Sequence, residues 1–116
     1  MVEKKNFDDP DDVARPWGKV TINRVNVMGR TLPRVTVEPG WTWKDFAQPV
    51  IGRERCPVFH VKMFFSGRFA VAYEDGTQDE FVAGDVAVIQ PGHDAWVVGD
   101  APVVFVDLAE LFTAPA

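Results

Sequence analysis

The chain has 116 residues, of which 47% are hydrophobic and 25% charged, a balance typical of one globular domain with a buried core. Its formal net charge of −5 argues against binding to nucleic acid or to anionic membranes, and no lysine and arginine cluster interrupts that acidity. We therefore expect the partner to be a small molecule or a second copy of the chain.

The single cysteine, Cys56, excludes an internal disulfide and favours a reducing compartment. The N-terminal residues MVEKKNFDDPDD lack the apolar stretch of a signal peptide, and no run approaches the length of a membrane span. These features predict a cytoplasmic protein.

Turn and cap signals dominate residues 1–17, where Asp9-Pro10 predicts one short helical turn because proline suits the first helical position. From residue 18, short β-branched stretches alternate with turn pairs such as Pro39-Gly40 and the hairpin signal Asp75-Gly76. Residues 107–116 predict a last helical turn. Strands are expected within residues 20–27, 32–37, 56–73 (two strands hinged at Ser66-Gly67), 79–81, 85–89, 95–98 and 102–106.

Short strands at this spacing, with almost no helical periodicity, indicate a closed barrel or a two-sheet jelly roll. Closure hides strand edges that a small all-β chain would otherwise expose. We predict an all-β domain over residues 18–108, preceded by an arm (residues 1–17) and followed by a tail (residues 109–116).

Two histidines, His60 and His93, are the first candidates for chemistry. Glu54, Cys56, His60 and Lys62 share one parity, so they project from one face if the strand is regular. Thiolate, imidazole and carboxylate together suit zinc, iron and related ions. The alternatives stay open: Glu54 as a solvent-facing loop residue, Cys56 as an inert core residue, and His93 as a turn histidine bonded to backbone.

The segment GDVAVIQPGHDAWVVGD (residues 84–100) resembles the second motif of the cupin superfamily, and residues 54–67 resemble the first. Trp41-x-Trp43, Ser66-Gly67-Arg68 and Asp75-Gly76-Thr77 are similar to a group of small bacterial single-domain cupins. The resemblance covers about residues 18 to 108. It implies a cupin-type jelly-roll β-barrel and commonly a homodimer, for which residues 20–27 are a candidate contact.

The candidate ligands are permuted relative to the cupin pattern. His60 takes the place of the motif glutamate, Cys56 and Glu54 take the places of two histidines, and His93 lies two residues before the usual position at Ala95. Because a shift of two keeps the face of a strand, His93 still points at the same centre. The set His60, His93, Cys56 and Glu54 is therefore either a rebuilt site for a divalent metal (Zn, Fe, Ni or Mn) or the remains of a lost one.

Lys62 lies on the inward parity beside His60, where a cation would repel a metal ion unless the amine is neutral or binds an anionic substrate. The apolar walls of a ligand pocket are expected from aromatic residues. The candidate pocket residues are Phe64, Tyr73, Trp41, Trp43, Asp94 and Trp96.

Three functions are compatible with these residues. The first is a metal-dependent enzyme of the oxygenase, isomerase, cyclase or lyase type, acting on a small organic substrate. The second is metal-free acid–base catalysis by His60 and His93, with Lys62 stabilising an enolate or holding a carboxylate. The third is a non-catalytic barrel that binds a small ligand. We favour the enzyme, with the metal ahead of metal-free catalysis.

Overall fold

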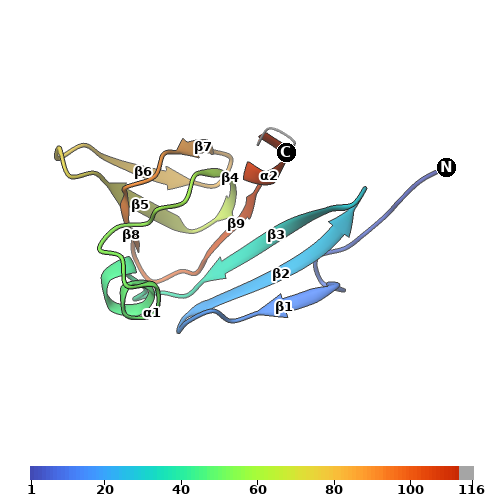
Figure 1. The fold of residues 1–116 in the computed structure, drawn as a ribbon, viewed down its shortest axis with the longest axis horizontal. Coiled ribbons are helices and arrows are strands. Elements are labelled where there is room, and N and C mark those ends of the chain that lie inside the picture. Colours follow the sequence, from blue (N-terminus) through green and yellow to red (C-terminus); the bar gives the residue numbers. More distant parts are fainter. Residues whose placement is uncertain (113–116) are drawn as a thin grey trace.

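A computed structural model describes residues 1–112, whose strands form two antiparallel sheets (Figure 1). The larger sheet has the strand order β1-β2-β3-β9-β4-β7 and the smaller sheet the order β6-β5-β8. The strands are β1 (Asp12–Ala14), β2 (Val20–Val27), β3 (Arg30–Val37), β4 (His60–Ser66), β5 (Arg68–Ala72), β6 (Gln78–Val82), β7 (Val86–Ile89), β8 (Asp94–Val97) and β9 (Val103–Asp107). The helical segments are η1 (Trp43–Ala47), α1 (Gln48–Ile51) and α2 (Ala109–Phe112).

The core forms between the two sheets because the strands alternate buried and more exposed residues. Strand β7 follows this rule strictly, with Ala87 and Ile89 buried and Val86 and Val88 exposed. Phe64 and Phe105 of the larger sheet pack against Phe69 of the smaller sheet, with their ring centroids 6.0 and 6.1 Å from that of Phe69. The predicted all-β jelly-roll fold is therefore confirmed.

The chain passes from the larger to the smaller sheet at Gly67, the predicted hinge between β4 and β5. Gly67 has a φ of +77°, which side chains rarely adopt, and a Cβ there would lie 2.4 Å from the carbonyl oxygen of Pro102. Only glycine fits this crossing without moving the backbone of the β9 segment.

The N-terminal residues differ from the prediction of a helical turn at Asp9-Pro10. Residues 6–9 form a turn, in which the Asn6 side chain accepts a bond from the Asp8 amide, and β1 then pairs with β2. The Asp11 carboxylate accepts the backbone N–H of Asn26 at 2.7 Å, which ties this segment along β2. The predicted helical turn is wrong because local side-chain bonds and strand pairing satisfy the backbone instead.

Strands β1, β2 and β3 form a three-stranded extension that projects away from the rest of the molecule (Figure 1). Because β2 pairs with β1 on one side and β3 on the other, residues 22–24 have no free edge for a second copy. An edge-to-edge dimer through these residues is therefore blocked.

Two further segments, one near the middle of the chain and one near its C-terminal end, are helical. Residues 43–51, for which no element was predicted, are helical, and the hydroxyl of Thr42 at their N-terminal end accepts the N–H of Asp45. A last helical turn is present as α2, and the rest of the tail, residues 113–116, lies outside the described residues. Within residues 1–112, none of the helices has the length and apolarity needed to cross a membrane.

Candidate metal centre

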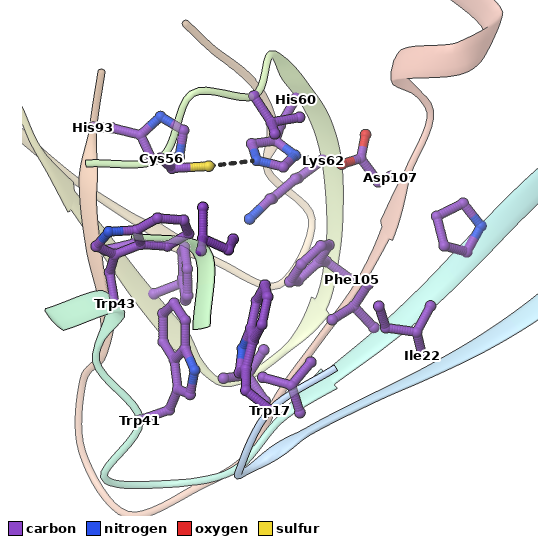
Figure 2. A pocket seen from close by; sticks show the side chains of 18 of the residues that line it. Trp17, Ile22, Trp41, Trp43, Cys56, His60, Lys62, His93, Phe105 and Asp107 are labelled. Atoms are coloured by element: carbon purple, nitrogen blue, oxygen red, sulfur yellow. Dashed lines mark hydrogen bonds and ion pairs between the residues drawn. The ribbon is translucent and has the colours of Figure 1, made fainter. Parts of the chain in front are cut away.

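A cavity of about 260 Å³ penetrates the core beside strands β2 and β3, and its walls are mostly aromatic and aliphatic. One end carries the polar residues Cys56, His60, Lys62, His93 and Asp107 (Figure 2). The remaining walls are formed mainly by Trp17, Val20, Ile22, Val35, Val37, Trp41, Trp43, Phe69, Ala95 and Phe105.

Cys56, His60 and His93 form a potential metal-binding cluster at the polar end. One ligand atom from each residue lies within 4.8 Å of the other two. Cys56 and His93 are held together by backbone pairing, because the Cys56 N–H donates to the His93 carbonyl at 2.8 Å and the Gly92 N–H donates to the Cys56 carbonyl at 2.7 Å. His60 reaches the same place from the start of β4.

His60 is oriented by Asp107 at the end of β9, whose Oδ2 lies 2.6 Å from His60 Nδ1. An ionised carboxylate only accepts hydrogen bonds, so His60 carries its proton on Nδ1 and leaves Nε2 as an acceptor. The Cys56 thiol donates to that Nε2 at 3.5 Å, the dashed line between these residues in Figure 2. At many metal sites, a carboxylate accepts the second ring N–H of a metal-binding histidine in this way.

His93 is oriented in the same way by a backbone carbonyl. Its Nδ1 donates to the Gln90 carbonyl at 2.8 Å, and the Tyr73 hydroxyl donates to that carbonyl at 3.0 Å. Tyr73 also packs edge-on against the His93 ring. The second ring nitrogen of His93 is therefore left as the ligand atom.

Burial sets the charge states of the donors. It lowers the pKa of His93 to about 4, and it lowers the pKa of His60 despite the opposing effect of the hydrogen bond that His60 donates to Asp107. Burial also raises the pKa of the Cys56 thiol. Both imidazoles are therefore neutral at pH 7, the form that binds metals, whereas the thiol would lose its proton on metal binding.

Asp107 stays ionised in this setting. Burial alone would raise its pKa, but the hydrogen bonds from His60 and from the backbone N–H groups of Ala109 and Val61 outweigh that effect and lower it. The carboxylate is thus available at neutral pH to hold the His60 tautomer.

Lys62 is buried, with 5% of its surface exposed, and its amine extends into the cavity below the Cys56–His60 pair (Figure 2). The amine lies 4.1 Å from the ring centroid of Phe105 and 4.6 Å from that of Phe69. Burial lowers the pKa of Lys62 to about 8. Lys62 therefore places a titratable cation next to the candidate metal ligands.

The structure brings only some of the predicted site residues together. Trp41 and Trp43 line the cavity with Cys56, His60, Lys62 and His93. Glu54 is exposed and lines a separate surface hollow together with Asp94, so neither residue reaches the cluster.

The other predicted pocket residues are also placed elsewhere. Phe64 is 1% exposed and packs among Phe69, Phe81 and Phe105 behind the cavity wall. Trp96 lies on the opposite face of β8 from Ala95. Tyr73 packs against the His93 ring and does not line the cavity.

Several cavity residues were not predicted from the sequence, among them Asp107, which holds His60, and Trp17. Asp107 shares the parity of the buried residues Val103 and Phe105 on β9, and this signal could have identified it. Trp17 precedes the first long strand, in a segment without a periodic pattern, and offered no comparable signal.

Comparison with solved structures identifies the fold, with 43 chains matching. The oxalate decarboxylase from Lactobacillus farciminis matches with a TM-score of 0.58 and 20% identity over 83% of this chain, which spans only 30% of that enzyme. The polyketide cyclase RemF from Streptomyces resistomycificus matches with a TM-score of 0.61 and 14% identity, over 92% of this chain and 79% of RemF.

A protein of unknown function from Rhizobium leguminosarum bv. viciae 3841 has a TM-score of 0.59 and 16% identity, with 92% of this chain and 95% of that one covered. No family model and no curated protein sequence matches the chain. Identities of this size show the fold alone. The predicted resemblance is confirmed at the level of the fold: the chain has a cupin-type fold, and its Cys/His/His cluster could hold a metal.

Proposed function

We propose that this protein is a metal-dependent enzyme acting on a small organic molecule in its cavity. The observation that carries the proposal is the convergence of Cys56, His60 and His93 within 4.8 Å, at the polar end of an otherwise apolar cavity. Three protein ligands leave a coordination position open to the cavity, which is typical of catalytic rather than structural metal sites.

The donor set fits a borderline metal ion. One thiolate and two neutral imidazoles suit zinc best, with iron and nickel next and manganese, which prefers oxygen ligands, last. Both histidines have their Nδ1 engaged, by Asp107 and by the Gln90 carbonyl, so the remaining nitrogens need no rearrangement to become ligands. Bound there, zinc would act as a Lewis acid toward a carbonyl or other substrate oxygen, whereas a redox metal would support oxygen-dependent chemistry.

The chain's own residues would contribute positioning and electrostatics. Asp107 holds the His60 tautomer and balances part of the positive charge at the site. The aromatic walls exclude water, which strengthens charge interactions within the cavity. Lys62 would stabilise negative charge on a substrate oxygen, the role expected for a preorganised cation beside a reacting centre.

The structural neighbours support catalysis on small molecules without defining the reaction. One is an oxalate decarboxylase and another a polyketide cyclase, and both share the fold of this chain. For this chain we keep the oxygenase, isomerase, cyclase and lyase classes as candidate reactions, because one fold hosts many chemistries.

The test is the metal content of the purified protein, compared with Cys56→Ser, His60→Ala and His93→Ala variants. We expect near-stoichiometric metal in the native protein and its loss in each variant. Cobalt(II) substitution adds a direct readout, because a thiolate ligand gives a charge-transfer absorption that Cys56→Ser removes. A natively folded protein that binds neither the native metal nor cobalt would refute the proposal.

The second candidate is metal-free acid–base catalysis, favoured by the Lys62 amine and by the two histidine rings in one cavity. The ring centroids of His60 and His93 are 5.4 Å apart, so a small substrate could contact both. Turnover that survives exhaustive chelation and is lost in His60→Ala would support it. A protein in which removal of both histidines produces no catalytic response, yet which retains ligand affinity, would instead be a binding barrel.

A further inference from the structure

We infer that the cavity takes a small planar carboxylate, with Lys62 as its counter-ion. This inference deepens the proposed function by naming the substrate class of the same cavity. It rests on three hydrogen-bond donors in the cavity wall that have no acceptor.

The first donor is the Lys62 amine. It forms no hydrogen bond or ion pair with any residue between positions 1 and 112, although only 5% of the side chain is exposed. The nearby carboxylate of Asp107 is already shared by His60 and by two backbone N–H groups. The rings of Phe69 and Phe105 give a cation–π contact, which replaces only part of the lost hydration of an ammonium group.

The second and third donors are the indole N–H groups of Trp17 and Trp41. Both nitrogens are buried without a hydrogen-bond partner among the described residues, and both rings line the cavity. The neighbouring Trp43 shows the usual arrangement, because its indole N–H donates to the Arg53 carbonyl at 3.0 Å. Buried indole N–H groups normally find such a partner, so these two add unpaired donors to the residues that line the cavity.

The polarity of this wall defines the complementary ligand. Ammonium and indole groups can only donate hydrogen bonds. Of the acceptors at the polar end, those on His60, His93 and Cys56 belong to the candidate metal cluster, and the Asp107 carboxylate already accepts three hydrogen bonds. A ligand that brings oxygen acceptors and a negative charge would satisfy the donors, whereas an amine would leave them unpaired and add repulsion at Lys62.

The rest of the cavity sets the size and shape of the ligand. A volume of about 260 Å³ lies just below the range of about 300–1,000 Å³ typical of drug-sized ligands. The walls include three indoles and two phenyl rings, which favour a flat apolar body. A single ring or a short conjugated chain bearing one carboxylate fits both limits.

The test uses benzoate and its neutral counterpart benzamide as probes, followed by intrinsic tryptophan fluorescence, since three of the four tryptophans line the cavity. We expect the wild-type protein to bind benzoate at least about tenfold more tightly than benzamide, the range for a hydrogen bond to a charged group. Lys62→Met should abolish this preference by lowering benzoate affinity much more than benzamide affinity. The matched control is Lys44→Met, which removes an exposed lysine and should keep the preference.

Equal binding of benzoate and benzamide to the wild-type protein would overturn the inference, and this comparison does not depend on any variant folding. A benzoate preference that persists in folded Lys62→Met would overturn it as well. The titration is run on protein as purified and after chelation, with metal content measured separately. A Lys62-dependent preference without any bound metal would uphold the carboxylate assignment while the metal proposal fails.

Discussion

Replacing Asp107 with asparagine tests whether the candidate site depends on the tautomer of His60. Oδ1 of Asp107 accepts the backbone N–H groups of Val61 at 3.2 Å and Ala109 at 2.9 Å, and an asparagine oxygen can keep both bonds. The asparagine amide would then replace Oδ2, which lies 2.6 Å from His60 Nδ1. Because the amide donates, His60 must move its proton to Nε2, the atom that would bind the metal.

The expected loss follows from that reversal. Removing a supporting group of this kind lowers metal affinity by about 10–100-fold, equivalent to about 1.4–2.7 kcal/mol. Loss of the charge-assisted bond should lower the free energy of unfolding of the metal-free protein by about 1–2 kcal/mol. The fold itself should persist, because both backbone bonds to Asp107 survive.

The assay is competition for zinc against a chromophoric chelator, together with nitrogen NMR of the imidazoles to identify the tautomer. Asp79→Asn is the matched control, because it removes the same charge from an exposed position on β6. Asp107→Asn with wild-type zinc affinity, or with the proton still on Nδ1 of His60, would show that the reasoning is wrong.

Three further predictions concern stability and assembly. Because Phe64 is 1% exposed in the aromatic core, Phe64→Ala should lower the free energy of unfolding by about 3–5 kcal/mol in a denaturant titration without changing metal stoichiometry. A loss below about 1 kcal/mol would contradict this placement. Gly67→Ala should cost at least about 2 kcal/mol and more than Gly76→Ala, since both have positive φ but only Gly67 faces backbone atoms; equal losses would count against the clash. We also predict a homodimer, which light scattering at micromolar concentration checks and a clean monomer would exclude.

Much of the fold could be predicted because strands separated by turn pairs leave a strong local signal. The alternation of side chains along a strand also predicted which residues face the site. His93, Ala95 and Val97 are all buried, so the two-residue shift of His93 does keep the inward face of β8. The same rule places Asp94 and Trp96 on the other face, and applying it strictly would have removed them from the predicted pocket.

Parity failed where the backbone is not extended. Residues 52–59 are irregular, so Glu54 does not share a face with Cys56 despite the even spacing.

Alternation along a regular strand also does not show how deep a side chain lies. Phe64 shares the inward face with Lys62, but the two residues lie at different depths along the strand. Lys62 stands opposite Asp107 at the cavity, whereas Phe64 stands opposite Phe105 and lies deeper in the core. Depth depends on strand register, which a single sequence does not reveal.

The permuted ligands converge because backbone pairing, rather than the motif spacing, determines their positions. The two bonds between Cys56 and the Gly92-His93 segment hold those two ligands together, and the pairing of β4 with β9 brings Asp107 to His60. Each contact joins segments far apart in the chain, so the site forms only when both sheets have folded. A metal that binds this arrangement and not the unfolded chain must therefore stabilise the whole domain. The cluster and the fold are thus coupled, whichever substrate the cavity takes.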